Sequence, residues 1–304
     1  MTIGTAALLL SASVALALSP AAAQSANPPA TQNAGQSPAQ NAGQIPGKQA
    51  PAKKAPQAKS KAEFDAYQAA AAETDPAKLE ASANDFAQKY AASELRPYLF
   101  QRAMGLYGHA NNPDKTLEMA RAVLKYDPAN PVALLTAAQM LTGRTHDSDL
   151  DRDARLEEAG ADAWSALRHA GEMAQPAGLT AKQFADAIAQ LRGGAHEVLA
   201  TIAYKKGDYV NAIQEYNAAG VEEKEHIDPV LWLRLAVAHD KRGERELGIA
   251  YAERAIASSE AGSPVRVLAE KEKARLEAQI PVHPAQKQAG SSSAPGPGAG
   301  APGL

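Results

Sequence analysis

Residues 195–220 have the sequence AHEVLATIAYKKGDYVNAIQEYNAAG, the pattern of a helix, a tight turn and a second helix. Gly207 stands in the turn, where glycine can end the first helix in a left-handed conformation without steric cost. Small residues occur at Ala200, Ala212 and Ala219, and large ones at Leu199, Tyr209 and Tyr216. Antiparallel helices approach closely where facing residues are small, and large neighbours fill the remaining space. The segment therefore predicts a packed helical hairpin.

The same arrangement returns 36 residues further along the chain, in a segment that begins at Pro229. Its turn is Lys241-Arg242-Gly243, and its small residues are Ala236, Gly248 and Ala255. Self-similarity at a fixed period of this length is the signature of stacked structural repeats.

Weaker copies precede these two. One has Phe100, Tyr107, Ala120, Val123 and Asp127-Pro128, with Met104 and Thr116 in place of small residues. The next has Leu134, Ala138 and Leu141, and it resumes after an insertion at Leu156, Ala159, Ala163 and Ala166. A degenerate first hairpin over residues 61–93 has Phe64, Tyr67, Ala69 and Phe86, as terminal repeats often do.

Two further helices are expected. Residues 178–206 form one long helix in this interpretation, with a break or kink at Gly193-Gly194. A final helix begins at Ser263 as N-cap and Pro264 in the first turn. It continues through Val265, Leu268 and Leu276, and Lys/Glu pairs on its other face suit a solvated cap.

These positions resemble the tetratricopeptide repeat, a helix–turn–helix unit of 34 residues. The second strong copy matches the family at Trp232, Leu235, Ala236, Gly243, Gly248 and Ala255, and departs from it at Arg245 and Ala252. The resemblance covers residues 61–280. It implies an all-α fold, an α-solenoid of antiparallel helix pairs with about five hairpins and a capping helix. The alternative is a non-repeating helical bundle with the same amphipathic period.

The resemblance also implies a non-catalytic scaffold that binds a protein or peptide on a concave face lined by first helices. The positions that face this surface in the family correspond here to Tyr98, Gln101, Gln139, Tyr204, Lys205, Asp240 and Lys241. The subfamily that grips a C-terminal carboxylate uses a set of Lys and Asn residues that this chain lacks, so that activity is not carried over. The alternative for each position is ordinary solvated surface.

The composition excludes several kinds of site. The chain has no cysteine, which excludes disulfides, thiolate metal sites and Cys nucleophiles. All 34 acidic residues lie between residues 62 and 280, and this acidic middle argues against a nucleic-acid-binding groove. The seven histidines are His109, His146, His169, His196, His226, His239 and His283, and none forms an i, i+4 pair. No catalytic motif is present, so neither an enzyme nor a cofactor is expected.

One acidic segment permits a weak calcium alternative. Asp147, Asp149, Asp151 and Glu158 stand at positions 1, 3, 5 and 12 of a calcium loop. Arg152, however, occupies the position that requires glycine for the sharp turn. Helix N-capping followed by self-compensating charges explains the alternation of Asp and Arg better, and no metal is expected.

The N-terminal residues are typical of an export signal. The apolar stretch at residues 6–17 is too short to span a bilayer, and Ala21 and Ala23 fit the small-residue rule for cleavage. We therefore expect residues 1–23 to be a signal peptide, although no Lys or Arg precedes the apolar stretch. Either the start codon lies upstream or the free amino terminus replaces the basic residue, and the alternative is an alanine-rich disordered tail.

The segments next to the repeats have the composition of disordered chain. Residues 24–60 are rich in Pro, Gln, Ala and Lys, and residues 281–304 in Pro, Gly and Ser. They are expected to be a linker and a tail around a domain at residues 61–280. The protein is then periplasmic or secreted, with no transmembrane span after signal cleavage.

Two functions from different classes follow. The first is an exported interaction scaffold that serves envelope assembly or secretion by binding a protein partner. The second is an accessory subunit of an envelope enzyme that binds cell-wall glycan or a small ligand. The second would need an aromatic-lined cleft, and the chain has four Phe and two Trp beside nine Tyr to build one.

Overall fold

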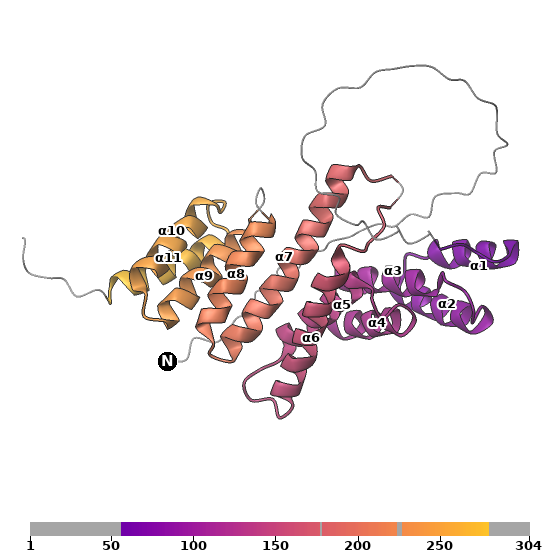
Figure 1. Cartoon of the computed structure of the whole chain (residues 1–304), viewed down its shortest axis with the longest axis horizontal. Helices are drawn as coiled ribbons and strands as arrows, with labels where there is room; N and C mark the ends of the chain where they lie inside the picture. Colours follow the sequence, from indigo (N-terminus) through magenta and orange to yellow (C-terminus); the bar gives the residue numbers. More distant parts are fainter. Residues whose placement is uncertain (1–55, 177, 224–226, 280–304) are drawn as a thin grey trace, which may run out of the picture. The chain divides into compact units, whose positions relative to one another are not determined.

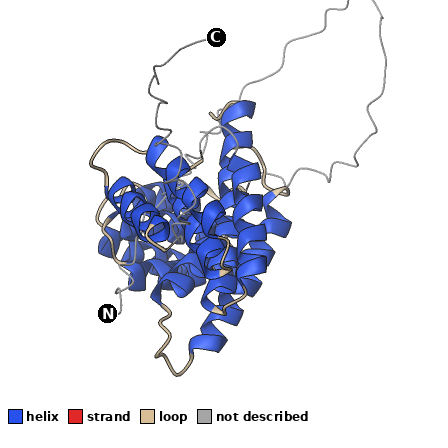
Figure 2. Cartoon of the chain, turned by 90° about the vertical axis from the view of Figure 1, so that its left-hand side faces the viewer, coloured by secondary structure: helices blue, strands red, loops and turns tan. Residues whose placement is uncertain are grey.

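The computed structural model describes residues 56–176, 178–223 and 227–279, which form eleven α-helices and no strand (Figure 1, Figure 2). The helices are α1 (Lys61–Ala71), α2 (Pro76–Lys89), α3 (Arg96–His109), α4 (Pro113–Tyr126), α5 (Pro131–Arg144), α6 (Arg152–Ala170), α7 (Ala181–Lys205), α8 (Tyr209–Glu223), α9 (Pro229–Lys241), α10 (Arg245–Ala257) and α11 (Pro264–Glu277). The expectation of an all-α chain is confirmed.

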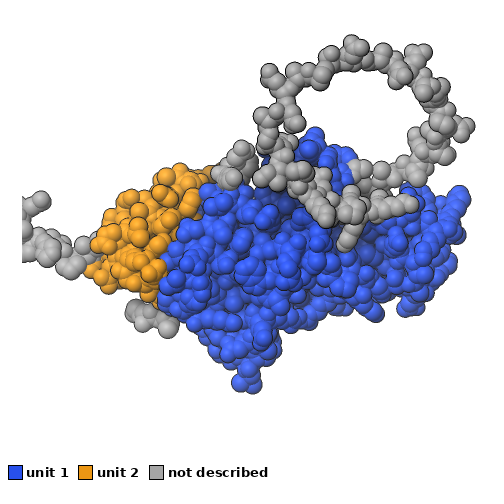
Figure 3. Space-filling view, viewed as in Figure 1, with its two compact units in different colours: residues 1–231 blue, residues 232–304 orange. Residues whose placement is uncertain are grey.

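The chain divides into two compact units, residues 1–231 (unit 1) and 232–304 (unit 2) (Figure 3). The boundary falls within the residues of α9. Unit 1 holds the hairpins α1–α2, α3–α4, α5–α6 and α7–α8. The second helix of one hairpin also packs on the first helix of the next, as α2 does on α3, α4 on α5 and α6 on α7. Unit 2 holds most of the hairpin α9–α10 and the helix α11. Successive hairpins with a capping helix match the predicted α-solenoid class.

The turn of the α7–α8 hairpin is the helix ending that its glycine predicts. Gly207 has φ +79°. The N–H of Asp208 donates to the carbonyl of Ala203 over 2.9 Å, and the N–H of Gly207 donates to the carbonyl of Tyr204 over 3.0 Å. This pair of bonds is the Schellman motif, which satisfies carbonyls that the helix end leaves free. The α3–α4 and α9–α10 turns have the same two bonds, at residues 111–112 and 243–244.

The small residues lie where the helices touch, as predicted. The alanines of both strong copies are completely buried at Ala200, Ala212, Ala219, Ala236 and Ala255. A Cβ on Gly248 would lie 3.1 Å from the carbonyl oxygen of Ala236 and 3.0 Å from Leu276 Cδ1, so α10 approaches α9 and α11 too closely for a side chain there. Backbone contact at small residues thus brings these helices together.

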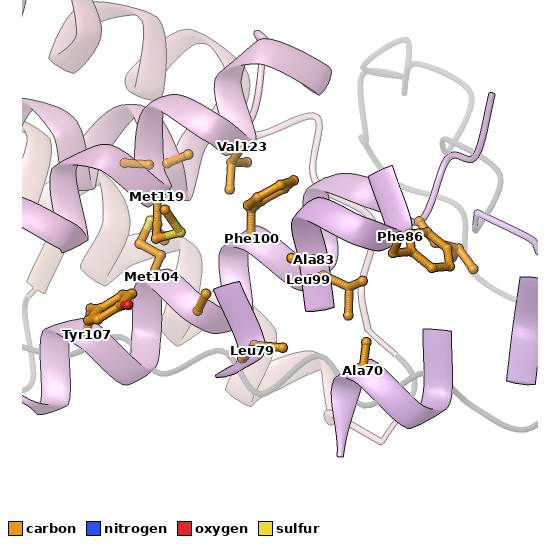
Figure 4. Packing of buried hydrophobic residues seen from close by; sticks show 14 of the residues in the cluster. Ala70, Leu79, Ala83, Phe86, Leu99, Phe100, Met104, Tyr107, Met119 and Val123 are labelled. Atoms are coloured by element: carbon orange, nitrogen blue, oxygen red, sulfur yellow. The ribbon is translucent and has the colours of Figure 1, made fainter. Parts of the chain in front are cut away.

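The core of the first two hairpins uses larger side chains. Figure 4 shows Phe100 and Met104 of α3 pointing toward Val123 and Met119 of α4, and all four are buried. Thr116 is also buried, so the two positions where Met104 and Thr116 replace small residues still belong to the core. In α1 the expectation for Ala69 is wrong, because Ala69 is exposed and the neighbouring Ala70 is buried.

The third hairpin departs from the regular repeat in two places. α7 is a single helix of 25 residues, so the predicted long helix is confirmed and no break occurs at Gly193-Gly194. A Cβ on Gly194 would lie 3.3 Å from Leu135 of α5, so this glycine lets α5 and α7 pack directly. The insertion is the loop of residues 145–151, and α6 follows it with Leu156, Ala159, Ala163 and Ala166 completely buried.

The start of the capping helix agrees with its prediction. The Ser263 hydroxyl accepts from the N–H of Arg266 over 3.4 Å, and Pro264 opens α11. Arg266 pairs with Glu270, and Lys273 with Glu277, as predicted for the helix. The expected solvated face is wrong for these two basic residues, because Lys273 also pairs with Glu253 of α10 at 2.7 Å and Arg266 donates to the carbonyl of Ser259. The predicted signal peptide at residues 1–23 and the tail at 281–304 lie outside the described residues, as does the linker at 24–60 except for residues 56–60.

Candidate functional site

Two of the predicted partner-binding residues lie on α3. The Tyr98 side chain is half-buried, and burial raises the pKa of its phenol, with smaller contributions from Asp127, Tyr67 and Glu94. Gln101 follows one turn later, and its side-chain oxygen accepts from the Asn130 amide over 3.4 Å. Asn130 is the N-cap of α5, where its oxygen accepts from the N–H of Ala133 over 3.0 Å. This bond joins the exposed side of α3 to the start of α5.

Gln139 lies on the next first helix, α5. Its side chain is half-buried beside α7, with its nitrogen 3.5 Å from the position that a Cβ on Gly194 would take. Tyr98, Gln101 and Gln139 thus lie on two successive first helices, and the Gln101–Asn130 bond connects α3 to the N-cap of α5, nine residues before Gln139. These three residues define what we call the first-helix face. The sequence did not single out Asn130, the residue that joins two of these helices.

Tyr204 and Lys205 lie ten residues beyond Gly194, nearly three helical turns away. Tyr204 contacts Tyr209 edge to face, with ring centroids 5.4 Å apart. The Lys205 ammonium donates to the carbonyl of Thr145 over 2.6 Å, and Arg152 donates to the carbonyl of Lys205. Burial lowers the pKa of Lys205. Lys205 therefore fastens the loop of residues 145–151 to the end of α7.

The last two predicted residues belong to unit 2. The Asp240 carboxylate accepts from the Arg275 guanidinium of α11 over 2.6 Å, so it ties the capping helix to α9. Lys241 is exposed at the end of α9. Partner binding by any of the seven positions stays a prediction.

The four acids of the calcium alternative are each engaged with other groups of the chain and do not converge on one point. Asp147 pairs with Arg152 at 3.3 Å and Asp151 with Arg155 at 2.7 Å, while Glu158 pairs with Arg121 of α4 at 2.7 Å. Asp149 accepts from the N–H of His146 over 2.9 Å, and this hydrogen bond is the main cause that lowers the pKa of Asp149. Within the described residues no three His, Asp or Glu side chains could hold a metal ion together. Asp151 precedes α6 without capping it through its side chain, so the expected N-capping is wrong at that residue.

Two histidines stabilise helix packing. His196 Nδ1 lies 2.7 Å from the Glu215 carboxylate of α8, and His239 Nδ1 lies 2.7 Å from the Glu244 carboxylate that opens α10. His239 also stacks on Tyr251 with ring centroids 5.0 Å apart. Both residues thus have the structural role expected of them. The buried Nε2 of His239, however, has no hydrogen-bond partner among the described residues.

An open depression in unit 1 lies between the start of α6 and the α7–α8 turn. Arg152, Asp153, Glu157 and Lys206 line it. All four side chains are charged, unlike the aromatic cleft that a glycan-binding subunit would need. Among the described residues, no helix has both the length and the apolar character that crossing a membrane requires.

No protein-family model and no curated protein matches the chain. Among solved structures, the chain is similar to a tetratricopeptide repeat protein from Parabacteroides merdae, with 15% identity and a TM-score of 0.37, over 70% of this chain and 88% of that one. The assignment therefore rests on the hairpins, turns and buried alanines of this chain, which define a helical-repeat protein of tetratricopeptide-like fold.

Proposed function

We propose that this protein is an exported, non-catalytic scaffold that binds a protein or peptide partner on its first-helix face and serves envelope assembly or secretion. The main support is that predicted partner-facing side chains remain accessible on successive first helices. Tyr98, Gln101 and Gln139 come from two successive first helices, joined through Asn130, and each is half-exposed. Amide and phenol groups at such positions can hydrogen-bond a peptide backbone while the ring of Tyr98 supplies apolar contact.

The partner can be captured with a photo-crosslinking amino acid placed at Gln101 or Gln139 in the full chain, in cells. The matched control is the same substitution at Gln88, an exposed glutamine on the second helix α2. We expect one protein to cross-link from both first-helix positions and not from Gln88. Equal cross-linking from all three positions would contradict the assignment of the face. Retention on purified peptidoglycan without any cross-linked protein would contradict the scaffold itself.

Export is tested separately, on the N-terminus of the protein made in its own cell. The expected mature chain begins at Gln24, after cleavage behind Ala23, and is recovered outside the cytoplasm. Intact mass and N-terminal sequencing measure this directly. A chain that keeps residues 1–23 and stays in the cytoplasm would overturn the proposed export and leave the partner-binding proposal to its own test.

A further inference from the structure

The outer side of α8 is uncharged along its whole length. Its exposed residues are Val210, Asn211, Gln214, Asn217 and Val221, and we call the four with a spacing of four, three and four residues, Val210, Gln214, Asn217 and Val221, the α8 seam. Val210 is 47% exposed and Val221 is 63% exposed, so both are among the large apolar side chains that the described residues leave open to solvent. The amides of Gln214 and Asn217 have no hydrogen-bond partner within the described residues. The seam therefore holds both unused apolar area and unused hydrogen-bonding groups.

The lack of charge arises because the acids of α8 turn toward α7. Glu215 pairs with His196 at 2.7 Å, and Glu222 pairs with Arg192 at 3.3 Å. Glu223 lies against the backbone of Gly193, where a Cβ would stand 2.7 Å from its carboxylate oxygen. The helix thus keeps its charges on the side that is already packed and leaves the solvent side neutral.

The α4 helix shows the opposite pattern at the same spacing. Its exposed residues are Asp114, Glu118, Arg121 and Lys125. The first three form ion pairs within the chain, with Arg144, Lys115 and Glu158 respectively. A charged, internally paired face of this kind is ordinary solvated surface. The α8 seam differs from it in both respects.

The spacing of the seam is that of a coiled-coil contact. Steps of four, three and four residues place Val210 and Asn217 at d positions and Gln214 and Val221 at a positions of a heptad. In an antiparallel pair of identical helices, a positions meet d positions of the second copy. Val210 then meets Val221 of the second copy, and Gln214 meets Asn217 of the second copy. Both contacts occur twice, as a two-fold interface requires.

The central layers of such a pair are chemically self-complementary. Each side-chain amide has an oxygen that accepts and an NH₂ group that donates, so Gln214 and Asn217 can exchange hydrogen bonds across the axis. A polar layer between apolar layers fixes register in coiled coils, because any slip would bury an amide against a valine. Antiparallel packing also sets each helix N-terminus beside the C-terminus of the other helix, which suits their dipoles.

We propose that a second copy of this chain docks on the α8 seam, as an antiparallel pair of α8 helices about a two-fold axis. The seam covers twelve residues of one helix, less than two heptads, so it buries less than the roughly 1,200 Å² at which stable complexes begin. The dimer is accordingly weak, and it forms only at high protein concentration. Its surface is separate from the first-helix face, so it does not depend on the proposed function.

Sedimentation velocity of the full chain, from low micromolar to near-millimolar concentration, tests the proposal. We expect wild-type protein to shift from monomer to dimer and Val221→Glu to weaken dimerisation at least tenfold, since it buries charge in both outer layers. The control is Val267→Glu on α11, where the valine is 38% exposed and lies outside the seam. Circular dichroism verifies that both variants fold. A wild-type chain that stays monomeric, or equal effects of the two variants, would overturn the proposal.

The register has its own test in a double variant, Gln214→Lys with Asn217→Glu. In the antiparallel pair each lysine meets a glutamate of the second copy, so dimerisation becomes tighter and weakens again with added salt. In a parallel pair the same changes set like charges against each other and abolish the dimer. Loss of dimerisation in the double variant would therefore refute the antiparallel seam, even if Val221→Glu behaves as expected.

Discussion

Asn111 and Gly207 occupy the same position in two helix-ending turns of unit 1, with φ of +52° and +79°. In both turns the N–H of this residue donates to the carbonyl three positions earlier over 3.0 Å. The next residue stands at the start of the second helix, and its side chain caps that helix. The Asn112 side chain accepts from the N–H of Lys115, and the Asp208 side chain accepts from the N–H of Asn211. One geometry thus closes both hairpins, although the two sequences share no residue in the turn.

The Gly207→Ala variant is expected to lose about 1–2 kcal/mol of unfolding free energy, since a Cβ is strained in the left-handed region. No atom lies within 4 Å of that Cβ, so the cost arises from the backbone alone. Gly105→Ala is the matched control, because Gly105 lies exposed inside α3 and also has free space around it. There alanine should stabilise by up to about 1 kcal/mol through helix propensity. Urea unfolding measures both, and equal signs would refute the turn geometry.

At residue 111 we expect the stability of the variants to rank glycine above asparagine above alanine, which puts alanine last and not first as in a helix. Asparagine tolerates the left-handed region better than alanine, and glycine tolerates it best. Asn111→Ala is expected to destabilise by about 1 kcal/mol, and Asn111→Gly to leave stability unchanged or raise it. Thermal unfolding followed by circular dichroism ranks the three. A ranking with alanine above glycine would show that residue 111 is helical in solution.

The sequence predicted the hairpins where a residue type has one dominant use. Gly207 and Gly243 mark turns because glycine is rare inside helices, and the alanines at fixed spacing mark close helix contacts. The left-handed turn at Asn111 was not predicted, because asparagine is also common in helix caps and loops. The predicted break at Gly193-Gly194 is wrong for a related reason. Glycine in a helix signals either a break or a close neighbour, and here it admits α5 beside α7.

The candidate site was less predictable, because its contacts join distant parts of the chain. Lys205 bonds to a carbonyl 60 residues earlier, and Asp240 bonds to an arginine 35 residues later. The repeat pattern assigns both residues to the partner-facing side. It predicts the helix face on which a residue lies, but it does not predict which distant segment of the same chain contacts that residue. Of the predicted set, Tyr98 and Gln101 lie about one turn apart on α3, whereas Gln139 lies on α5.

The Lys205→Met variant is expected to loosen the loop of residues 145–151 and leave partner binding intact. Methionine keeps the apolar stem and removes the donor to the Thr145 carbonyl, a loss of about 1–2 kcal/mol. Amide hydrogen exchange in the loop should then rise several-fold. Lys206→Met is the control, because the neighbouring lysine is exposed. If Lys205→Met loses the cross-linked partner and hydrogen exchange in the loop is unchanged, Lys205 binds the partner and does not hold the loop.

Asp162 should make stability depend on pH at the α4–α6 contact. Burial, and then the charge of Glu158 one turn earlier, raise the pKa of Asp162 to about 6 against the opposing effect of Arg121. Unfolded aspartate has a pKa of about 3.9. Between these values the folded chain holds a proton that the unfolded chain has released, so unfolding free energy falls as pH rises from about 4 to about 6.

The Asp162→Asn variant has no such proton to hold, so this part of the fall should disappear. Because Asp162 is half-buried and partly screened by solvent, the variant should exceed wild type by about 1 kcal/mol above pH 6 and lose that advantage near pH 4. Urea unfolding at several pH values between these limits measures the difference. Asp85→Asn, at an exposed position of α2, is the control and should follow the wild-type profile. Parallel profiles for Asp162→Asn and wild type would mean that Asp162 is already ionised below pH 5 in the folded chain.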